Sequence, residues 1–171
     1  LKINSYNLDL LLRHEFNIIR GNILDSAKFG IWSFHHGDNS FYRGGPVAFW
    51  ETINNEKVVG VTLQKLTPEL DGGLIIDKGY YNLHWSSYKT ENEILEYSST
   101  ILMKNINRLL DGNLKLKKSE VYYNRIFKVP NMFFLTKYLI NFYSNLISKL
   151  YYLLIYKLFS IRSNCWSLFI G

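Results

Sequence analysis

The side chains best suited to chemistry gather in one short stretch, residues 32–46. This stretch carries two adjacent imidazoles, a carboxylate, an amide and a guanidinium, in the order His35, His36, Asp38, Asn39 and Arg43. A histidine exchanges protons near neutral pH, and a carboxylate commonly orients it. Asp71, at a second strand–turn junction, is one candidate for this carboxylate. These residue types predict an active or binding site here. The alternative interpretation is a solvated loop in which the glycines only make turns.

Metal chemistry is not predicted. His35, His36 and Asp38 are metal-ligand types, but three ligands from one short loop give poor coordination geometry. Cys165 is the only cysteine, which excludes a disulfide framework and a multi-cysteine zinc site. A single cysteine also favours a reducing, cytoplasmic compartment.

Strand and helix signals alternate around these residues. Strands are predicted at 16–19, 31–35, 58–66 and 74–81, and helices at 5–14, from Pro46 onward, and from Thr90 to Gly112. Thr90 and Glu93 have the spacing of a capping box. This alternation predicts an α/β fold with a parallel sheet. Ligands of such sheets bind at the carboxyl ends of the strands, which is where His35 falls.

Charge and glycine content divide the chain near Gly112. Residues 113–171 hold 9 of the 20 basic side chains and only one of the 14 acidic ones. Ten of the 11 glycines lie at or before Gly112. We therefore expect a catalytic domain at 1–112, a connector at 113–130, a long basic amphipathic helix at 131–160, and at 161–171 the start of a downstream domain opening with a strand at 164–170.

The predicted helix is too polar to span a bilayer. Its longest uncharged run, residues 138–148, has 11 residues, whereas a span needs about 20. Two interpretations stay open for residues 131–159. The helix packs against protein, which we favour because apolar residues surround most of it, or it lies on an anionic membrane as a peripheral contact.

Several motifs between residues 16 and 76 resemble, in order, the folate-dependent formyltransferases. Residues 16–21 (FNIIRG) are similar to the family strand that backs the folate pocket, and residues 33–35 (SFH) fall on its Asn-x-His motif. Residues 42–44 (YRG), 60–64 (GVTLQ) and 69–73 (ELDGG) match the following loop, strand and Leu-Asp-x-Gly signature. The resemblance covers roughly residues 5–110. It implies the C-terminal part of a Rossmann-like domain whose N-terminal half is missing, so we expect a piece cut at both ends.

The resemblance also implies roles for single residues. The family histidine corresponds to His35, which would shuttle a proton or stabilise developing charge, and the family aspartate corresponds to Asp71, which would orient His35. Ser33 stands where the family has an oxyanion-binding asparagine. A hydroxyl reaches less far than an amide, and losing an oxyanion donor costs roughly a hundred- to a thousandfold in rate.

Binding residues are implied as well. Formyltetrahydrofolate, the formyl donor, would contact Phe16, Ile18, Ile19, Arg20 and Gly21. His36, Asn39 and Arg43 would contact the acceptor. The acceptor is expected to be a small-molecule amine, sugar-linked rather than a nucleic acid. A sheet lacking its first half exposes an edge, which predicts self-association into a homo-oligomer.

Three functions remain open: formyl transfer to an amine, hydrolysis of formyltetrahydrofolate, and a degenerate formyltransferase fold used as a binding module. Formate release without an amine would favour hydrolysis. Folate binding without turnover would favour the binding module.

Overall fold

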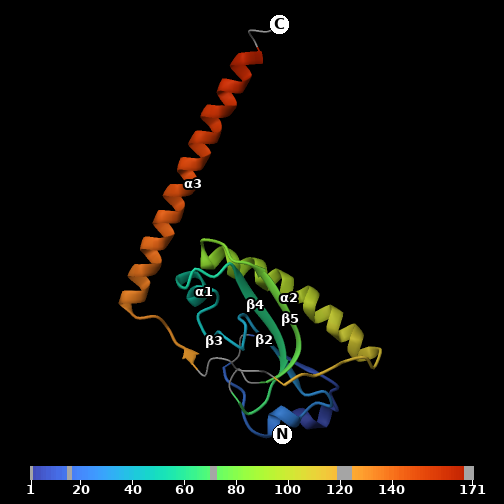
Figure 1. Cartoon of the computed structure of the whole chain (residues 1–171). Coiled ribbons are helices and arrows are strands. Elements are labelled where there is room, and N and C mark those ends of the chain that lie inside the picture. The colour runs from blue at the N-terminus through green and yellow to red at the C-terminus, as the bar shows by residue number, and fades with distance from the viewer. Residues whose placement is uncertain (1, 15–16, 70–72, 119–124, 168–171) are drawn as a thin grey trace. The chain divides into compact units, whose positions relative to one another are not determined.

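A computed structural model describes residues 2–14, 17–69, 73–118 and 125–167, with side chains up to residue 159. The chain forms two compact units, Leu1–Val129 and Pro130–Gly171. The first is a mixed α/β unit built on a four-stranded sheet in the order β1-β2-β4-β5 (Figure 1). It therefore extends beyond Gly112, where the composition changes.

Three of the predicted strands are confirmed. They are β2 (Ile31–His35), β4 (Val58–Lys65) and β5 (Leu74–Asn82). The fourth strand is β1 (Leu11–Arg13), which pairs in parallel with β2, whereas β2–β4 and β4–β5 are antiparallel. The expectation of a parallel sheet is therefore wrong for two of the three pairs.

The N-terminal predictions are also wrong in detail. In place of a helix at 5–14 there is a 3₁₀ turn, η1 (Lys2–Tyr6), followed by β1. Residues 17–20 have no regular structure, and a second 3₁₀ turn, η2 (Asn22–Asp25), follows them. The strand pairing with β2 is thus made by residues 11–13 and not by 17–19. Phe16 itself lies outside the described residues.

Helix α2 (Ser87–Leu110) covers one face of the sheet (Figure 1). Its Ile94 and Ile101 pack on Val59, Val61 and Leu63 of β4 in the hydrophobic core. The helix begins one turn before the predicted capping box: the Ser86 side chain accepts a hydrogen bond from the Lys89 N–H. It ends as predicted at Gly112, whose φ of 68° is left-handed.

The other face of β4 is polar but equally buried. Thr62 and Gln64 are 0% and 2% exposed because the loop of residues 37–40 lies over them. Thr62 Oγ1 donates to the Gly37 carbonyl at 3.1 Å, and Asn39 Nδ2 lies 3.5 Å from Gln64 Oε1. Gly60 allows this approach, since a Cβ there would come within 2.7 Å of the Asp38 nitrogen. The polar face of β4 thus holds the loop that carries the candidate residues.

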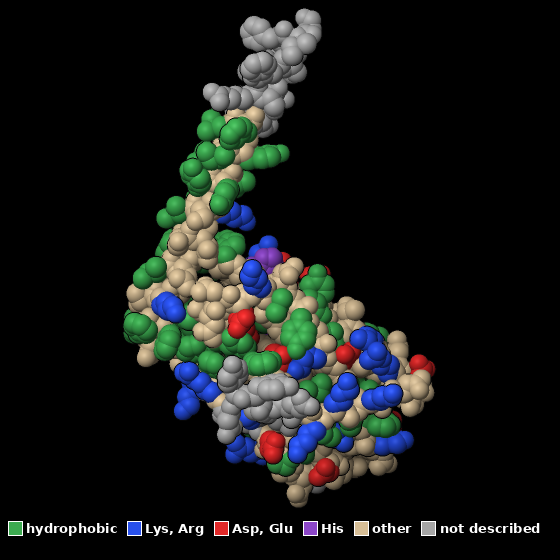
Figure 2. Space-filling model, in the orientation of Figure 1, with side chains coloured by type: hydrophobic (Ala, Val, Ile, Leu, Met, Phe, Trp, Pro, Cys, Tyr) green, Lys and Arg blue, Asp and Glu red, His purple; other side chains and the backbone are tan. Residues whose placement is uncertain are grey.

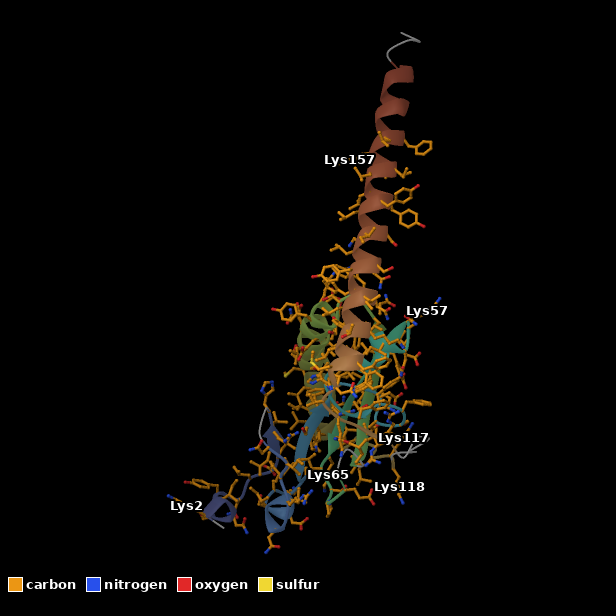
Figure 3. All side chains as sticks on the ribbon, turned by 90° about the vertical axis from the view of Figure 1, so that its left-hand side faces the viewer. Lys2, Lys57, Lys65, Lys117, Lys118 and Lys157 are labelled. Atoms are coloured by element: carbon orange, nitrogen blue, oxygen red, sulfur yellow. The ribbon has the colours of Figure 1, made fainter. Side chains whose placement is uncertain are left out.

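The connector contributes to this unit. Its β6 (Ile126–Phe127) pairs in parallel with β3 (Arg43–Gly44), and Lys117 forms a bridge with Ile75 of β5. Figure 3 labels Lys117 beside the sheet. The short helix α1 (Phe49–Ile53) starts three residues later than the helix predicted from Pro46. As predicted, its Trp50 and Ile53 are buried.

The second unit is one helix, α3 (Met132–Ser167). It continues through residues 164–167, so no strand forms there as predicted, and the rest of the predicted strand lies outside the described residues. Hydrophobic side chains stand along the coloured part of this helix in Figure 2. Phe133, Ile140 and Tyr152 are each more than 60% exposed. Figure 3 labels Lys157 among them. Within the described ranges, no helix is both long and apolar enough to cross a membrane.

Candidate functional site

Strand β2 presents its side chains alternately to the two faces of the sheet. Phe34 and His36 share one face, where their rings stack with centroids 5.8 Å apart. His36 Nε2 lies 3.1 Å from Ser98 Oγ of α2. Burial beneath α2 lowers the pKa of His36 to about 4, with smaller contributions from His35 and His14. His36 is therefore a neutral side chain under α2, and it does not join His35.

His35 projects from the opposite face and is 7% exposed. Its Nε2 lies 2.6 Å from the backbone carbonyl oxygen of Tyr42. Because a carbonyl oxygen only accepts hydrogen bonds, Nε2 must carry the proton of this contact. In the neutral ring, Nδ1 is then the nitrogen that can take up a further proton. The prediction that His35 sits at the end of a buried strand is confirmed.

Ser33 lies on the same face as His35, two residues earlier. Its hydroxyl oxygen accepts a hydrogen bond from Arg13 Nη1 at 3.0 Å and lies 3.3 Å from the Phe34 carbonyl. Arg13 is the register partner of Ser33 in the parallel β1–β2 pair. Sequence reasoning missed Arg13, because its importance depends on a strand pairing that the local pattern does not indicate. A guanidinium thus stands beside the Ser33 hydroxyl.

Other predicted site residues are dispersed. Asp71 and Phe16 lie outside the described residues, so the pairing of Asp71 with His35 stays a prediction. Ile18 is 55% exposed, and Ile19, Arg20 and Gly21 also lie in irregular backbone at the surface. They do not form the strand that was expected to back a folate pocket, although their surface remains accessible to a ligand.

Asn39 and Arg43 occupy two different environments. Asn39 is fully buried against β4, and its Oδ1 makes no hydrogen bond among the described residues. Arg43 is half-buried in β3 and borders a small cavity together with Trp50 and Glu51. The structure thus places Asn39 against β4 and Arg43 beside α1.

Asp38 anchors the loop to β5. Its carboxylate accepts hydrogen bonds from Lys78 Nζ at 2.5 Å, the Tyr80 hydroxyl at 2.5 Å and the Ser40 N–H at 2.9 Å. Burial raises the pKa of Asp38, but these hydrogen bonds together outweigh that effect and hold the pKa below its usual value. Asp38 is therefore an ionised structural anchor. Within the described ranges, no three His, Cys, Asp or Glu side chains are grouped to hold a metal ion.

A cleft of about 630 Å³ opens beside this anchor. The aromatic residues Phe41, Tyr42, Tyr80 and Phe127 line it together with the acidic residues Asp38, Glu51 and Glu56. The Tyr42 hydroxyl donates to Glu56 Oε1 at 2.8 Å. Burial raises the pKa of Tyr42 to about 12, so this phenol stays protonated at neutral pH.

Glu51 is the second group that sequence reasoning missed. It is 3% exposed although its side chain borders the cleft. Burial raises its pKa to about 7; its own backbone N–H opposes this, and the charges of Glu56 and Asp38 add to it. Glu51 lies in the apolar run of residues 46–53. An acidic side chain in such a run is either buried with its neighbours or interrupts the apolar face of the helix, and this is the sequence signal that could have indicated its burial.

The α/β fold described above is similar to that of solved formyltransferases. A formyltransferase from *Helicobacter canadensis*, solved with folinic acid and dTDP-3-aminofucose, superposes with a TM-score of 0.65 at 20% identity, covering 82% of this chain and 58% of that one. A 4-N formyltransferase from *Francisella tularensis* superposes with a TM-score of 0.61 at 20% identity, over 81% and 62%.

The sequence matches the same class of protein. Methionyl-tRNA formyltransferase of *Borrelia duttonii* (strain Ly) is 26% identical over 117 residues, 66% of this chain and 37% of the relative. The bifunctional polymyxin resistance protein ArnA of *Wigglesworthia glossinidia brevipalpis* is 30% identical over 104 residues, 61% of this chain and 16% of the relative. No family model matches the chain. The chain resembles the formyltransferases in sequence and fold, and it spans little more than a third of the first relative's length.

Proposed function

We propose that this chain supplies the catalytic part of an enzyme that transfers a formyl group from formyltetrahydrofolate to a primary amine of a sugar or sugar nucleotide. The observation that carries the proposal is the arrangement of Arg13, Ser33 and His35 on one face of β1 and β2. Solved structures of the same fold hold folinic acid with an amino sugar nucleotide, or tetrahydrofolate with a formamido sugar nucleotide, which supports both substrate classes.

Each of the three side chains has a task in this proposal. When bound, formyltetrahydrofolate supplies the formyl group. The Tyr42 carbonyl keeps the proton of neutral His35 on Nε2, so that Nδ1 accepts a proton from the attacking amine. Arg13 Nη1, held against the Ser33 hydroxyl, provides the positive charge for the developing oxyanion that an asparagine amide would otherwise stabilise.

The donor-binding surface is part of the same proposal. Residues 17–21 would bind the donor, because exposed Ile18 offers apolar area to a flat ring and Arg20 offers a cation to an anionic tail. Arg43 would bind an acidic part of the acceptor, such as a phosphate. Asp71 remains the proposed partner of His35.

Formyl transfer is tested by incubating the protein with 10-formyltetrahydrofolate and dTDP-3-aminofucose and following tetrahydrofolate and the formamido product. Initiator methionyl-tRNA belongs in the same assay as the second candidate acceptor, because methionyl-tRNA formyltransferases are among the matching relatives. Product formed only with the amino sugar supports the proposal. Formate released without an amine would indicate a hydrolase, and binding of folinic acid without turnover would indicate a binding module.

For α3 we propose docking against protein, with a peripheral membrane contact as the competing interpretation. Exposed apolar side chains stand around the helix, while Lys137, Lys149 and Lys157 are its cations within residues 132–159. Co-sedimentation with phosphatidylserine vesicles separates the two. Salt-sensitive binding that is lost on deleting residues 131–159 would contradict docking against protein.

A further inference from the structure

Glu51 is a buried acid that the mechanism above does not use. Every residue of α1 is buried, and Glu51 is the charged one among them. None of the ion pairs between described residues includes it. Burying a carboxyl group without a counter-charge is costly, so its retention beside a cleft calls for an explanation. A ligand that carries positive charge would provide one.

The groups facing Glu51 favour such a ligand. Asp38 and Glu56 add negative charge, but Asp38 is compensated by Lys78 and Glu56 accepts the Tyr42 hydroxyl. Tyr80 donates to Asp38 and so stays protonated. The carboxyl group of Glu51 is thus the acid of this cleft with no cation or hydroxyl donor of its own among the described residues.

Cations are also present around Glu51, but none of the ion pairs between described residues joins one of them to its carboxyl group. Arg125 lines the cleft with its guanidinium 5.0 Å from the centre of the Phe127 ring. His36 and Arg43 border a second, small cavity together with Glu51, and His36 is neutral at pH 7. Aromatic faces beside a carboxylate are a favourable environment for an ammonium group.

We propose that the cleft binds the acceptor amine as its ammonium ion, with Glu51 as the counter-ion and first proton acceptor. This inference rests on the proposed function. The proton balance is simple: the N–H bond of R–NH₃⁺ breaks, its proton passes to the Glu51 carboxylate, and R–NH₂ and a neutral carboxylic acid remain. The nitrogen then has the lone pair that attack on a formyl carbon requires. The proton leaves through the open side of the cleft.

Tyr42 connects this cleft to His35. Its backbone carbonyl accepts the His35 Nε2–H, and Tyr42 also lines the cleft. In this proposal the two proton-handling groups divide the work. Glu51 removes the proton that makes the amine an ammonium ion, and His35 handles the proton released after attack.

The test compares D-glucosamine with D-glucose, which differ by the amino group, in isothermal titrations at pH 7 of the full chain. We expect glucosamine to bind at least tenfold more tightly than glucose, and Glu51→Gln to remove this preference while leaving glucose binding unchanged. Glu96→Gln, an exposed acid on α2, is the charge-matched control and should behave as the unmodified protein. Equal binding of the two sugars by the unmodified protein, or an unchanged preference in Glu51→Gln, would overturn the proposal.

A second measurement does not need the variant to fold. The ¹³C resonance of the Glu51 carboxyl group should titrate at a lower pH when glucosamine is present, and an unmoved midpoint would count against the proposal. Folinic acid binding, measured separately, distinguishes the two proposals. Its absence contradicts the formyltransferase function, whereas its presence without discrimination between the sugars contradicts only the role of Glu51.

Discussion

The Nε2 atom of His35 lies 2.6 Å from the backbone carbonyl oxygen of Tyr42. This contact fixes both the orientation of the ring and the position of its proton. A backbone carbonyl does not change its charge with pH, so it holds one tautomer of the neutral ring. The same loop is anchored at Asp38, so the position of His35 depends on contacts with β5 as well as on β2.

His35→Ala should lower kcat by at least a hundredfold, because general acid–base catalysis contributes about 10²–10⁴-fold. The fold should persist, since the side chain faces the polar loop and not the α2 core. Turnover of formyltetrahydrofolate with the amine acceptor and a circular dichroism spectrum measure the two quantities. His84→Ala, which removes a histidine paired with Glu93 at the surface, is the control. Unchanged turnover in His35→Ala would refute the assignment.

Arg13→Met should reduce kcat by about 10²–10³-fold with a smaller change in KM, because an oxyanion donor acts mainly in the transition state. Ser33→Ala should reduce kcat less, since the guanidinium remains. Arg108→Met on α2 is the matched control. A change confined to KM would indicate that Arg13 binds a substrate instead.

Asp38→Ala should destabilise the first unit by about 3 kcal/mol, because it leaves Lys78 without its buried partner. Urea unfolding at pH 7 measures the free energy of unfolding. Asp111→Ala, at the exposed end of α2, should change it by less than about 0.5 kcal/mol. If the free energy of unfolding falls equally little in both variants, Asp38 does not anchor the loop.

Stability should fall as the pH rises through the titration of Glu51. Its pKa is raised from 4.5 to about 7 in the folded protein, so its contribution is fully present below pH 4.5 and is lost as the pH rises through about 7. The difference corresponds to at most about 3 kcal/mol, at 1.36 kcal/mol for each pKa unit. Glu51→Gln should therefore unfold at higher urea than the unmodified protein at pH 8, with no such gain at pH 4. Parallel stability profiles would contradict this expectation.

The strands β2, β4 and β5 and the end of α2 could be predicted because each has a local signal. Val59, Val61 and Leu63 alternate along β4, and Gly112 supplies the left-handed conformation that ends α2. Strand β1 has only three residues and becomes a strand through its pairing with β2. Its local pattern is as compatible with a helix, which explains the error at residues 5–14.

The residue types of the candidate site could be predicted from the sequence, but the contacts between these residues could not. The position of His35 could be predicted from the end of β2. That His36 lies on the opposite face from His35 could be seen only once the faces of the sheet were known. The bond between Asp38 and Lys78 joins residues 40 positions apart in sequence. The burial of Glu51 likewise depends on packing against segments that are distant in the sequence. Such long-range contacts leave no signal in the local pattern.

The pairing of β3 with β6 determines the order in which parts of this unit can fold during synthesis. Arg43 and Gly44 meet Ile126 and Phe127, and Gly44 has no room for a side chain because a Cβ would come within 2.1 Å of the Phe127 carbonyl oxygen. On a ribosome, residues 31–82 emerge and can pair long before residue 127 is made. The sheet is therefore available early, while one wall of the cleft is added last, after closing a loop of about 80 residues. Nascent chains would carry the histidine before they carry a finished binding surface.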